Sequence, residues 1–184
     1  VRKITLPSGT MLPSNASKER SGTHRELRHR AQRLDKAARK MLELHQSRDG
    51  EGDAPDSQHS RQRRIDELHH VAQAMREFVA REQPRRNGKG QELKSNVTDN
   101  DSAKMATSKG VIQGYAAQAA VDAKHQVIVA ADVTGSGSEQ AMLLPMIVQA
   151  RAQARQDTLM TADAGYHSHE NMRALHEAGI AALV

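Results

Sequence analysis

Apolar residues in the first half of the chain recur at alternating spacings of four and three, which places them on one face of an α-helix. Two such stripes occur, the first made of Leu27, Ala31, Leu34, Ala38, Met41 and His45, the second of Ile65, Leu68, Ala72, Met75 and Val79. Thr23 and Glu26 form a capping-box pattern before the first stripe, and Pro84 follows the second. Residues 49–56, rich in Asp and Gly, indicate an exposed turn. The pattern therefore predicts an antiparallel helical hairpin.

The second half of the chain has a different pattern, rich in Val, Ile and Ala. Segments 115–121 and 126–133 predict a β-hairpin with a turn at 122–125. The elements expected after it are a helix over about 139–155, a strand over 158–163, a helix from Ser168 to Ala178 that stops at Gly179, and a strand from 181. Before the helical hairpin, residues 3–6 predict a short strand and residues 14–17 a loop.

This order of elements predicts an α/β fold with a mixed sheet and flanking helices, interrupted by the all-α hairpin. We expect residues 1–16 to hold the first strand, residues 17–90 the insert and residues 91–184 the rest of the sheet domain. Residues 85–111, polar and Gly-containing, are expected to form a linker or a long functional loop. The last strand ends with the chain, so we expect a C-terminally truncated domain.

Composition narrows the class of protein. The 184 residues contain no cysteine, which excludes a disulfide scaffold and a Cys-based zinc site. The lack of cysteine also fits a reducing cytosol, and we expect a cytoplasmic protein. No apolar run approaches the roughly 20 residues that span a bilayer, so we expect no membrane partner. With one Phe, two Tyr and no Trp, the core must be built from Ala, Leu, Val, Ile and Met.

Positive charge is concentrated in the helical region. The net charge is +5, and residues 17–90 hold 18 Lys and Arg against 12 Asp and Glu. A basic surface favours a polyanion such as DNA, although a solvated Arg-rich hairpin would have the same composition. The residues that we expect to contact DNA phosphates are Arg61, Arg63, Arg64, Arg85, Arg86 and Lys89.

Four stretches together resemble one family. They are Leu-Pro-Ser-Asn-Ala-Ser-Lys at 12–18, Thr-Asp-Asn-Asp-Ser-Ala-Lys-Met at 98–105, Gly-Val-Ile-Gln-Gly-Tyr at 110–115 and Thr-Ala-Asp-Ala-Gly-Tyr-His-Ser at 161–168. In this order they resemble bacterial insertion-sequence DDE transposases, most closely the subgroup with a helical insert after the first strand. The resemblance implies an RNase H-like fold, and it implies DNA at the transposon ends, a second copy or a full-length transposase as partners, at the bacterial nucleoid.

The resemblance also implies the chemistry. In the family, two Asp and one Glu hold two Mg²⁺ (or Mn²⁺) ions, which drive DNA strand cleavage and transfer. Asp163 matches the second Asp of the family, as a catalytic residue and metal ligand at the end of a strand. An Asp in this position also commonly caps a turn, which is the structural alternative.

Two departures from the family motif predict that this chain is catalytically inactive. Ser8, followed by Gly9, stands where the family has its first Asp, and the family's Glu lies beyond residue 184. Asp122, Asp132 and Glu139 have no spacing that recommends them as replacements, and we expect Glu139 to form a capping box with Ser136. His167 and His169 beside Asp163 make an incomplete zinc site. The alternative function is a non-catalytic DNA-binding or transposase-partner module built on the basic hairpin.

Overall fold

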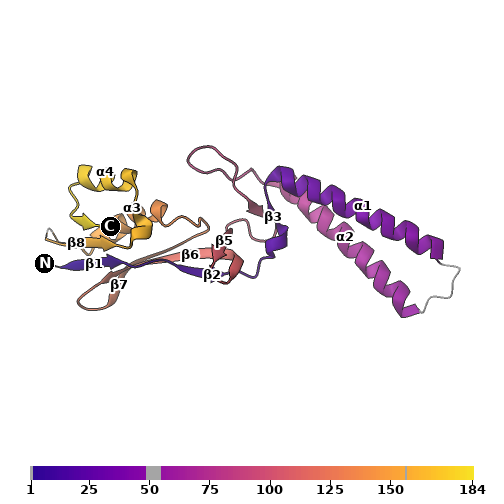
Figure 1. The fold of residues 1–184 in the computed structure, drawn as a ribbon, viewed down its shortest axis with the longest axis horizontal. Coiled ribbons are helices and arrows are strands. Elements are labelled where there is room, and N and C mark those ends of the chain that lie inside the picture. Colours follow the sequence, from indigo (N-terminus) through magenta and orange to yellow (C-terminus); the bar gives the residue numbers. More distant parts are fainter. Residues whose placement is uncertain (1, 49–54, 156) are drawn as a thin grey trace. The chain divides into compact units, whose positions relative to one another are not determined.

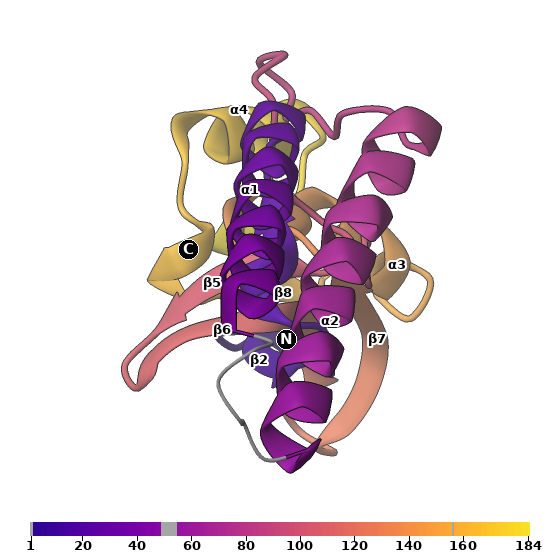
Figure 2. The ribbon, with the colours of Figure 1, turned by 90° about the vertical axis from the view of Figure 1, so that its right-hand side faces the viewer.

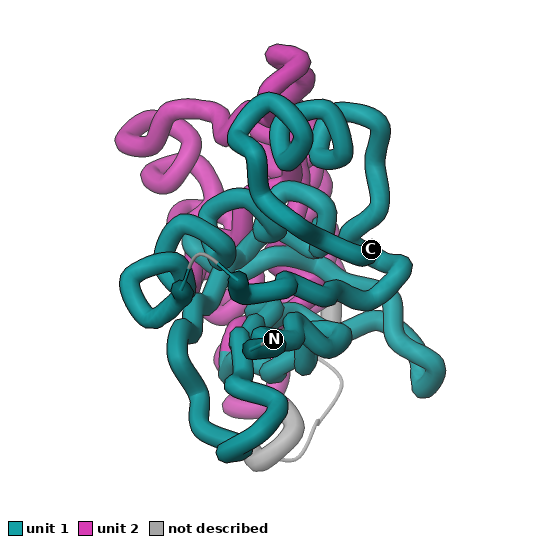
Figure 3. The backbone as a smooth tube through the Cα atoms, turned by 90° about the vertical axis from the view of Figure 1, so that its left-hand side faces the viewer, with its two compact units in different colours: residues 1–15, 101–184 teal, residues 16–100 magenta. Residues whose placement is uncertain are grey.

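The computed structural model describes residues 2–48, 55–155 and 157–184. The chain divides into two compact units (Figure 3). The sheet unit comprises residues 1–15 and 101–184, and the helical unit comprises residues 16–100. The helical unit is therefore inserted into the sheet unit.

The sheet unit is built on one mixed sheet (Figure 1). Its strands are β1 (Lys3–Leu6), β2 (Thr10–Pro13), β5 (Ala103–Thr107), β6 (Gly110–Asp122), β7 (Val127–Thr134), β8 (Leu159–Ala162) and β9 (Ala182–Leu183). The long strand β6 pairs antiparallel with β1, β2, β5 and β7, whereas β8 pairs parallel with β1 on one side and β9 on the other. The predicted hairpin, first strand and last strands are confirmed.

The sequence pattern missed two strands of the sheet unit, and it also missed the two short strands of the helical unit at 21–22 and 95–96. β2 was not predicted, and β5 with the start of β6 occupies part of the segment 85–111 that was expected to be a linker or loop. That expectation is wrong for the last third of the segment. The physical reason is that β2 has no buried residue and β5 only one, Met105, so neither shows a hydrophobic period.

Helices cover the sheet and close its core. The 3₁₀ turn η2 (Gln140–Met142) leads into α3 (Leu143–Arg151), and η3 (Ala164–Tyr166) precedes α4 (His169–Glu177). The predicted helix over 139–155 is shorter than expected, because its first turn is 3₁₀ and α3 ends at Arg151, followed by a turn at residues 152–153. Ser168 caps α4 by accepting from the Asn171 N–H at 3.1 Å, as predicted. The buried core contains Ile4, Leu6, Ala120, Leu143, Met146, Ile147, Met160, Tyr166 and Leu175.

The helical unit is the predicted antiparallel hairpin of α1 (His24–Arg48) and α2 (Pro55–Arg81), which lie side by side in Figure 2. Leu27, Ala31, Ala72, Met75 and Phe78 form its core. The capping box is confirmed, because the Thr23 N–H donates to Glu26 at 2.8 Å and the Glu26 N–H donates to the Thr23 hydroxyl at 3.2 Å. Most of the predicted turn, residues 49–54, lies outside the described residues.

Residues 91–100 belong to the helical unit through a small sheet and one buried amide. After the 3₁₀ turn η1 (Lys18–Arg20), β3 (Ser21–Gly22) pairs with β4 (Ser95–Asn96). The Asn96 amide donates to the Ser17 carbonyl and the Ser21 hydroxyl, both at 2.8 Å, and it accepts from the Thr98 N–H at 2.9 Å. Because Asn96 is fully buried, each of these bonds replaces one to water. Neither described helix of this unit, nor α3 or α4, is long and apolar enough to cross a membrane.

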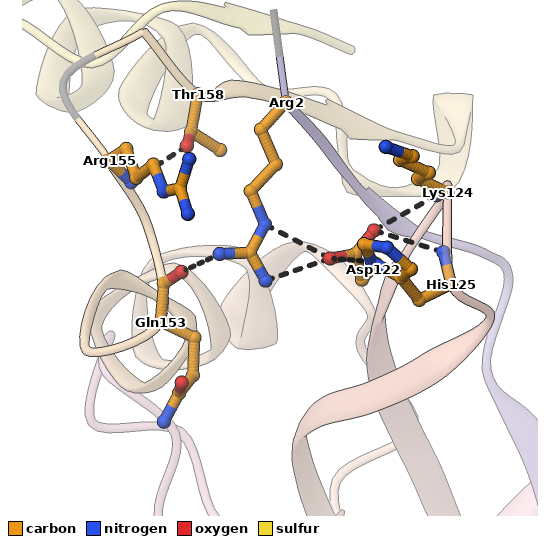
Figure 4. A network of polar contacts seen from close by, with 7 residues as sticks. All are labelled: Arg2, Asp122, Lys124, His125, Gln153, Arg155 and Thr158. Carbon is orange, nitrogen blue, oxygen red and sulfur yellow. Dashed lines mark hydrogen bonds and ion pairs between the residues drawn. The ribbon is translucent and has the colours of Figure 1, made fainter.

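Asp122, at the end of β6, anchors the start of the chain (Figure 4). Its carboxylate, almost fully buried, accepts from Arg2 Nε at 3.0 Å and pairs with Arg2 Nη2 at 2.8 Å. It also accepts from the N–H groups of Lys124 at 2.9 Å and His125 at 3.3 Å. Burial alone would raise the pKa of Asp122, but the hydrogen bonds from Lys124, His125 and Arg2 outweigh it and hold the pKa well below its usual range.

The substitution Asp122→Asn tests this anchor. Because the folded state lowers the pKa of Asp122, its contribution to stability is present above the unfolded pKa of about 3.9 and is lost as the pH falls toward the folded value. We expect the variant to unfold at a lower temperature than the wild type at pH 7, and the difference to shrink as the pH falls below about 4. Thermal unfolding followed by circular dichroism measures this. A difference that does not change with pH would contradict the role of the ionised carboxylate.

Candidate functional site

The carboxyl ends of β1 and β8 form the candidate site. These strands are parallel neighbours, with Leu6 in register with Ala162, and the Asp163 N–H donates to the Leu6 carbonyl oxygen at 3.0 Å. Ser8 and Asp163 therefore follow adjacent strand ends at the same edge of the sheet. Both residues are exposed to solvent. This edge is where open α/β sheets usually bind ligands.

Asp163 has a local structural role as well as an exposed position. Its Oδ1 accepts from the Gly165 N–H at 3.2 Å and begins the 3₁₀ turn η3. The turn-capping geometry considered as the structural alternative is thus present. It leaves the side chain exposed at the strand end, so capping and ligand binding are compatible for this carboxylate.

Glu139 brings a second carboxylate to the same edge. Its Oε1 accepts from the Gly9 N–H at 2.8 Å, across 130 positions of sequence. The predicted capping box with Ser136 is wrong, because the Glu139 side chain makes no capping bond to η2 and binds the Ser8–Gly9 turn instead. A Cβ on Gly165 would lie 2.1 Å from Glu139 Oε2, so a larger residue there would displace this carboxylate. Glu139 therefore lies between the turn after β1 and the turn after β8.

No pattern in the sequence around Glu139 marks it as a residue of the candidate site. An acidic residue between a Gly-Ser loop and a helix is typical of a helix cap, and no local signal specifies a partner in the first ten residues. The signal that could have helped is Gly165, since a glycine directly after the Asp163-Ala164 pair permits close approach of another group.

A shallow cavity of about 420 Å³ opens beside these residues. Its lining comes from the turn after β1, from β2 and β6, and from the loop before η2. The lining residues are Gly9, Met11, Ala116, Gly137, Ser138, Glu139, Gln140 and Gly165. Glu139 is the only carboxylate among them, and Ser8 and Asp163 lie outside this set.

The buried side chain of Tyr166 contacts the turn that follows β1. The side chain is fully buried, and its hydroxyl hydrogen-bonds with the Pro7 carbonyl oxygen at 3.2 Å and with Gln118 Oε1. Burial, and then the negative charges of Glu139 and Asp163, raise the pKa of Tyr166 to about 12. Both carboxylates therefore act electrostatically on one hydroxyl that also holds the residue before Ser8.

Across the described residues, no group of three or more His, Cys, Asp or Glu side chains is arranged to hold a metal ion. At the site itself the oxygen donors are two carboxylates, Glu139 and Asp163, and the neutral hydroxyl of Ser8. Each of those carboxylates already accepts one backbone N–H, Glu139 from Gly9 and Asp163 from Gly165.

The six basic residues expected to contact phosphates do not form one cluster. Arg61, Arg63 and Arg64 lie near the start of α2, whereas Arg85, Arg86 and Lys89 follow its end, about 30 Å away along the helix axis. Some of their guanidinium groups are engaged within the helical unit. Arg64 pairs with Glu67 at 2.7 Å, and Arg85 and Arg86 donate to the carbonyl oxygens of Asn100 and Gly90 at 2.6 and 2.7 Å.

The substitution Tyr166→Phe tests the buried hydroxyl. We expect it to lower the free energy of unfolding by about 1 kcal/mol, because a buried hydrogen bond to Pro7 is lost. A raised folded pKa contributes stability below the unfolded value of about 10, and this contribution is lost as the pH rises toward 12. Absorbance titration of tyrosinate should show a late-titrating tyrosine that is absent in Tyr166→Phe and present in Tyr115→Phe. Its persistence in Tyr166→Phe would contradict the assignment.

Comparison with known proteins identifies the second half of the chain. Residues 88–184 match a family model described as a transposase DDE domain. Comparison with curated proteins and with solved structures finds no match. The matched residues include Glu139 and Asp163, whereas Ser8 and both long helices precede them. Since the match covers more than half of the 184 residues, this chain belongs to the transposase DDE domain family.

Proposed function

We propose that this chain is part of the catalytic domain of a bacterial insertion-sequence DDE transposase, and that its DNA-cutting centre is impaired by Ser8. The family cuts and transposes DNA. The observation that supports the proposal is the parallel pairing of β1 with β8, because the in-register strand ends Leu6 and Ala162 lead to Ser8 and Asp163 at the same sheet edge. An acid at position 8 would complete a pair of carboxylates there, and a serine cannot.

An RNase H-like architecture is part of this proposal. The mixed sheet supports it. Across the sheet the strands lie in the order β7, β6, β1, β8 and β9, in which β6 is antiparallel to β1 whereas β8 and β9 are parallel to it. The helices α3 and α4 follow β7 and β8 in the chain, as expected for crossover connections. The helical unit then represents the insert that distinguishes the proposed subgroup.

Divalent metal is the expected cofactor of the family, where bound Mg²⁺ or Mn²⁺ would activate the attacking oxygen and stabilise the leaving one. The residues described here do not fit a site for two such ions. Hard cations require several anionic oxygen ligands, and Ser8 supplies a neutral hydroxyl. Glu139 is held by the Gly9 N–H, and the described residues contain no metal-binding group of three.

DNA at transposon ends is the proposed partner, and the bacterial nucleoid the proposed place of action. The alternative, a non-catalytic DNA-binding or transposase-partner module, rests on the basic composition of residues 17–90. Its six candidate Arg and Lys residues lie in two separate groups, so this alternative lacks a concentrated basic surface. A second copy of the chain or a full-length transposase as partner stays a prediction.

Metal binding and plasmid nicking test the role of Ser8. We expect the wild type to leave supercoiled plasmid intact in Mn²⁺ and to bind Mn²⁺ weakly in an electron paramagnetic resonance titration. Ser8→Asp adds a carboxylate beside Asp163, so we expect it to bind Mn²⁺ at least about tenfold more tightly, a gain of about 1.4 kcal/mol.

Two further variants make the result specific. Asp163→Ala should remove the gain of Ser8→Asp when the two are combined, whereas Asp66→Asn, which removes an exposed carboxylate from α2, should leave it unchanged. Nicking by the wild type that disappears in Asp163→Ala would overturn the proposed impairment. Equal Mn²⁺ affinity in the wild type and Ser8→Asp would overturn the proposed role of position 8.

A further inference from the structure

A second cavity lies at the other end of β1, about 20 Å from Ser8 at the rise of an extended strand. Its volume is about 780 Å³. It is formed by the start of β1, the turn between β6 and β7, and the loop before β8. The lining residues are Arg2, Lys3, Asp122, Ala123, Lys124, His125, Arg155 and Asp157. Four Arg and Lys side chains thus line the cavity together with two carboxylates, and His125 adds an imidazole ring.

One of the two carboxylates cannot repel an anion effectively. Asp122 is neutralised by the two-point contact with Arg2 and accepts the N–H groups of Lys124 and His125. Arg2 is also fixed, since its Nη1 donates to the Gln153 carbonyl oxygen. Arg2 and Asp122 therefore neutralise each other's charge, and the pair forms the base of the cavity.

The other Lys and Arg side chains that line the cavity are available to bind an anion. Figure 4 shows Arg2 between Arg155 on one side and the turn with Lys124 and His125 on the other. Among the described residues, the side chains of Lys3, Lys124 and Arg155 form no ion pair. Arg155 extends from a turn closed by bonds from its N–H to the Thr158 hydroxyl at 2.8 Å and from the Thr158 N–H to its carbonyl at 3.0 Å. These two hydrogen bonds tie Arg155 to Thr158, the residue before β8.

We propose that this cavity binds a phosphate group of the DNA backbone through Lys124 and Arg155. A phosphate diester accepts several hydrogen bonds at once, and lysine and arginine are its usual partners. The inference rests on the proposed function, since a chain of the transposase DDE domain family has DNA as its expected ligand. It adds an anchoring contact on the sheet unit, at the end of β1 opposite the acidic edge.

The salt dependence of DNA binding tests this contact on the full chain. Each phosphate contact contributes about 0.9 to the slope of log affinity against log salt concentration. The probe is a fluorescein-labelled duplex of about 20 base pairs, titrated by anisotropy at several KCl concentrations between about 20 and 200 mM. For Lys124→Gln combined with Arg155→Gln, we expect the slope to fall by about 1 and the affinity at about 100 mM KCl to fall about tenfold, as the loss of one phosphate contact requires.

Two matched double variants separate the possible outcomes. Lys104→Gln with Lys109→Gln removes two exposed charges from β5 and the turn after it, and should leave the slope within about 0.5 of the wild-type value. If the cavity variant behaves like this control, the cavity does not hold a phosphate. If Arg63→Gln with Arg64→Gln alone abolishes binding, the helical hairpin carries the DNA and the inference fails while DNA binding stands. No binding by the wild type at low salt would overturn both the cavity contact and the proposed DNA partner.

Discussion

The parallel pairing of β1 with β8 is the constraint on which the rest of the sheet unit depends. Ile4 and Leu6 are fully buried and Met160 nearly so, and burying each such side chain contributes about 1.5–3 kcal/mol. The register that this burial fixes brings the last residue of β1 level with the last residue of β8. A shift by one residue would turn Ile4 and Leu6 toward solvent, so the register is strongly specified. Two chain segments far apart in sequence therefore end at one edge, and Glu139 and Tyr166 reach the first turn only because that edge exists.

The parts of the fold that could be predicted are those with local causes. The capping box at Thr23 and Glu26, the cap at Ser168 and the stripes of the helical hairpin each depend on residues within one or two helical turns. The parts that could not be predicted depend on distant partners. β2 has no buried residue and exists because β6 pairs with it, and Glu139 resembles a local cap until its bond to Gly9 is seen. Asp163 could be selected from its motif, and Ser8 from the order of the family motifs along the chain. No sequence pattern specifies how these two residues are arranged in space.

Charge is separated along β1 in the sheet unit. At one end, Glu139 and Asp163 lie close enough to a buried tyrosine to raise its pKa. At the other end, Arg2, Lys3, Lys124 and Arg155 surround a carboxylate whose own charge is neutralised. Exposed charges more than about 8–10 Å apart are largely screened at physiological salt, so the two ends act as independent surfaces. The acidic end suits cations and the basic end suits anions, and one four-residue strand fixes the distance between them.

The helical unit leaves and re-enters the sheet at a single position. Pro13 of β2 and Ala103 of β5 both pair with Gly114 of β6, one on each side, and a Cβ at Gly114 would lie 2.1 Å from the Leu12 carbonyl oxygen. The two ends of the insertion are therefore separated by two strand spacings, about 10 Å. Three or four extended residues cover that distance. Gain or loss of this insertion during evolution would therefore leave the strand order intact. Sheets with and without the helical hairpin can thus share one ancestry.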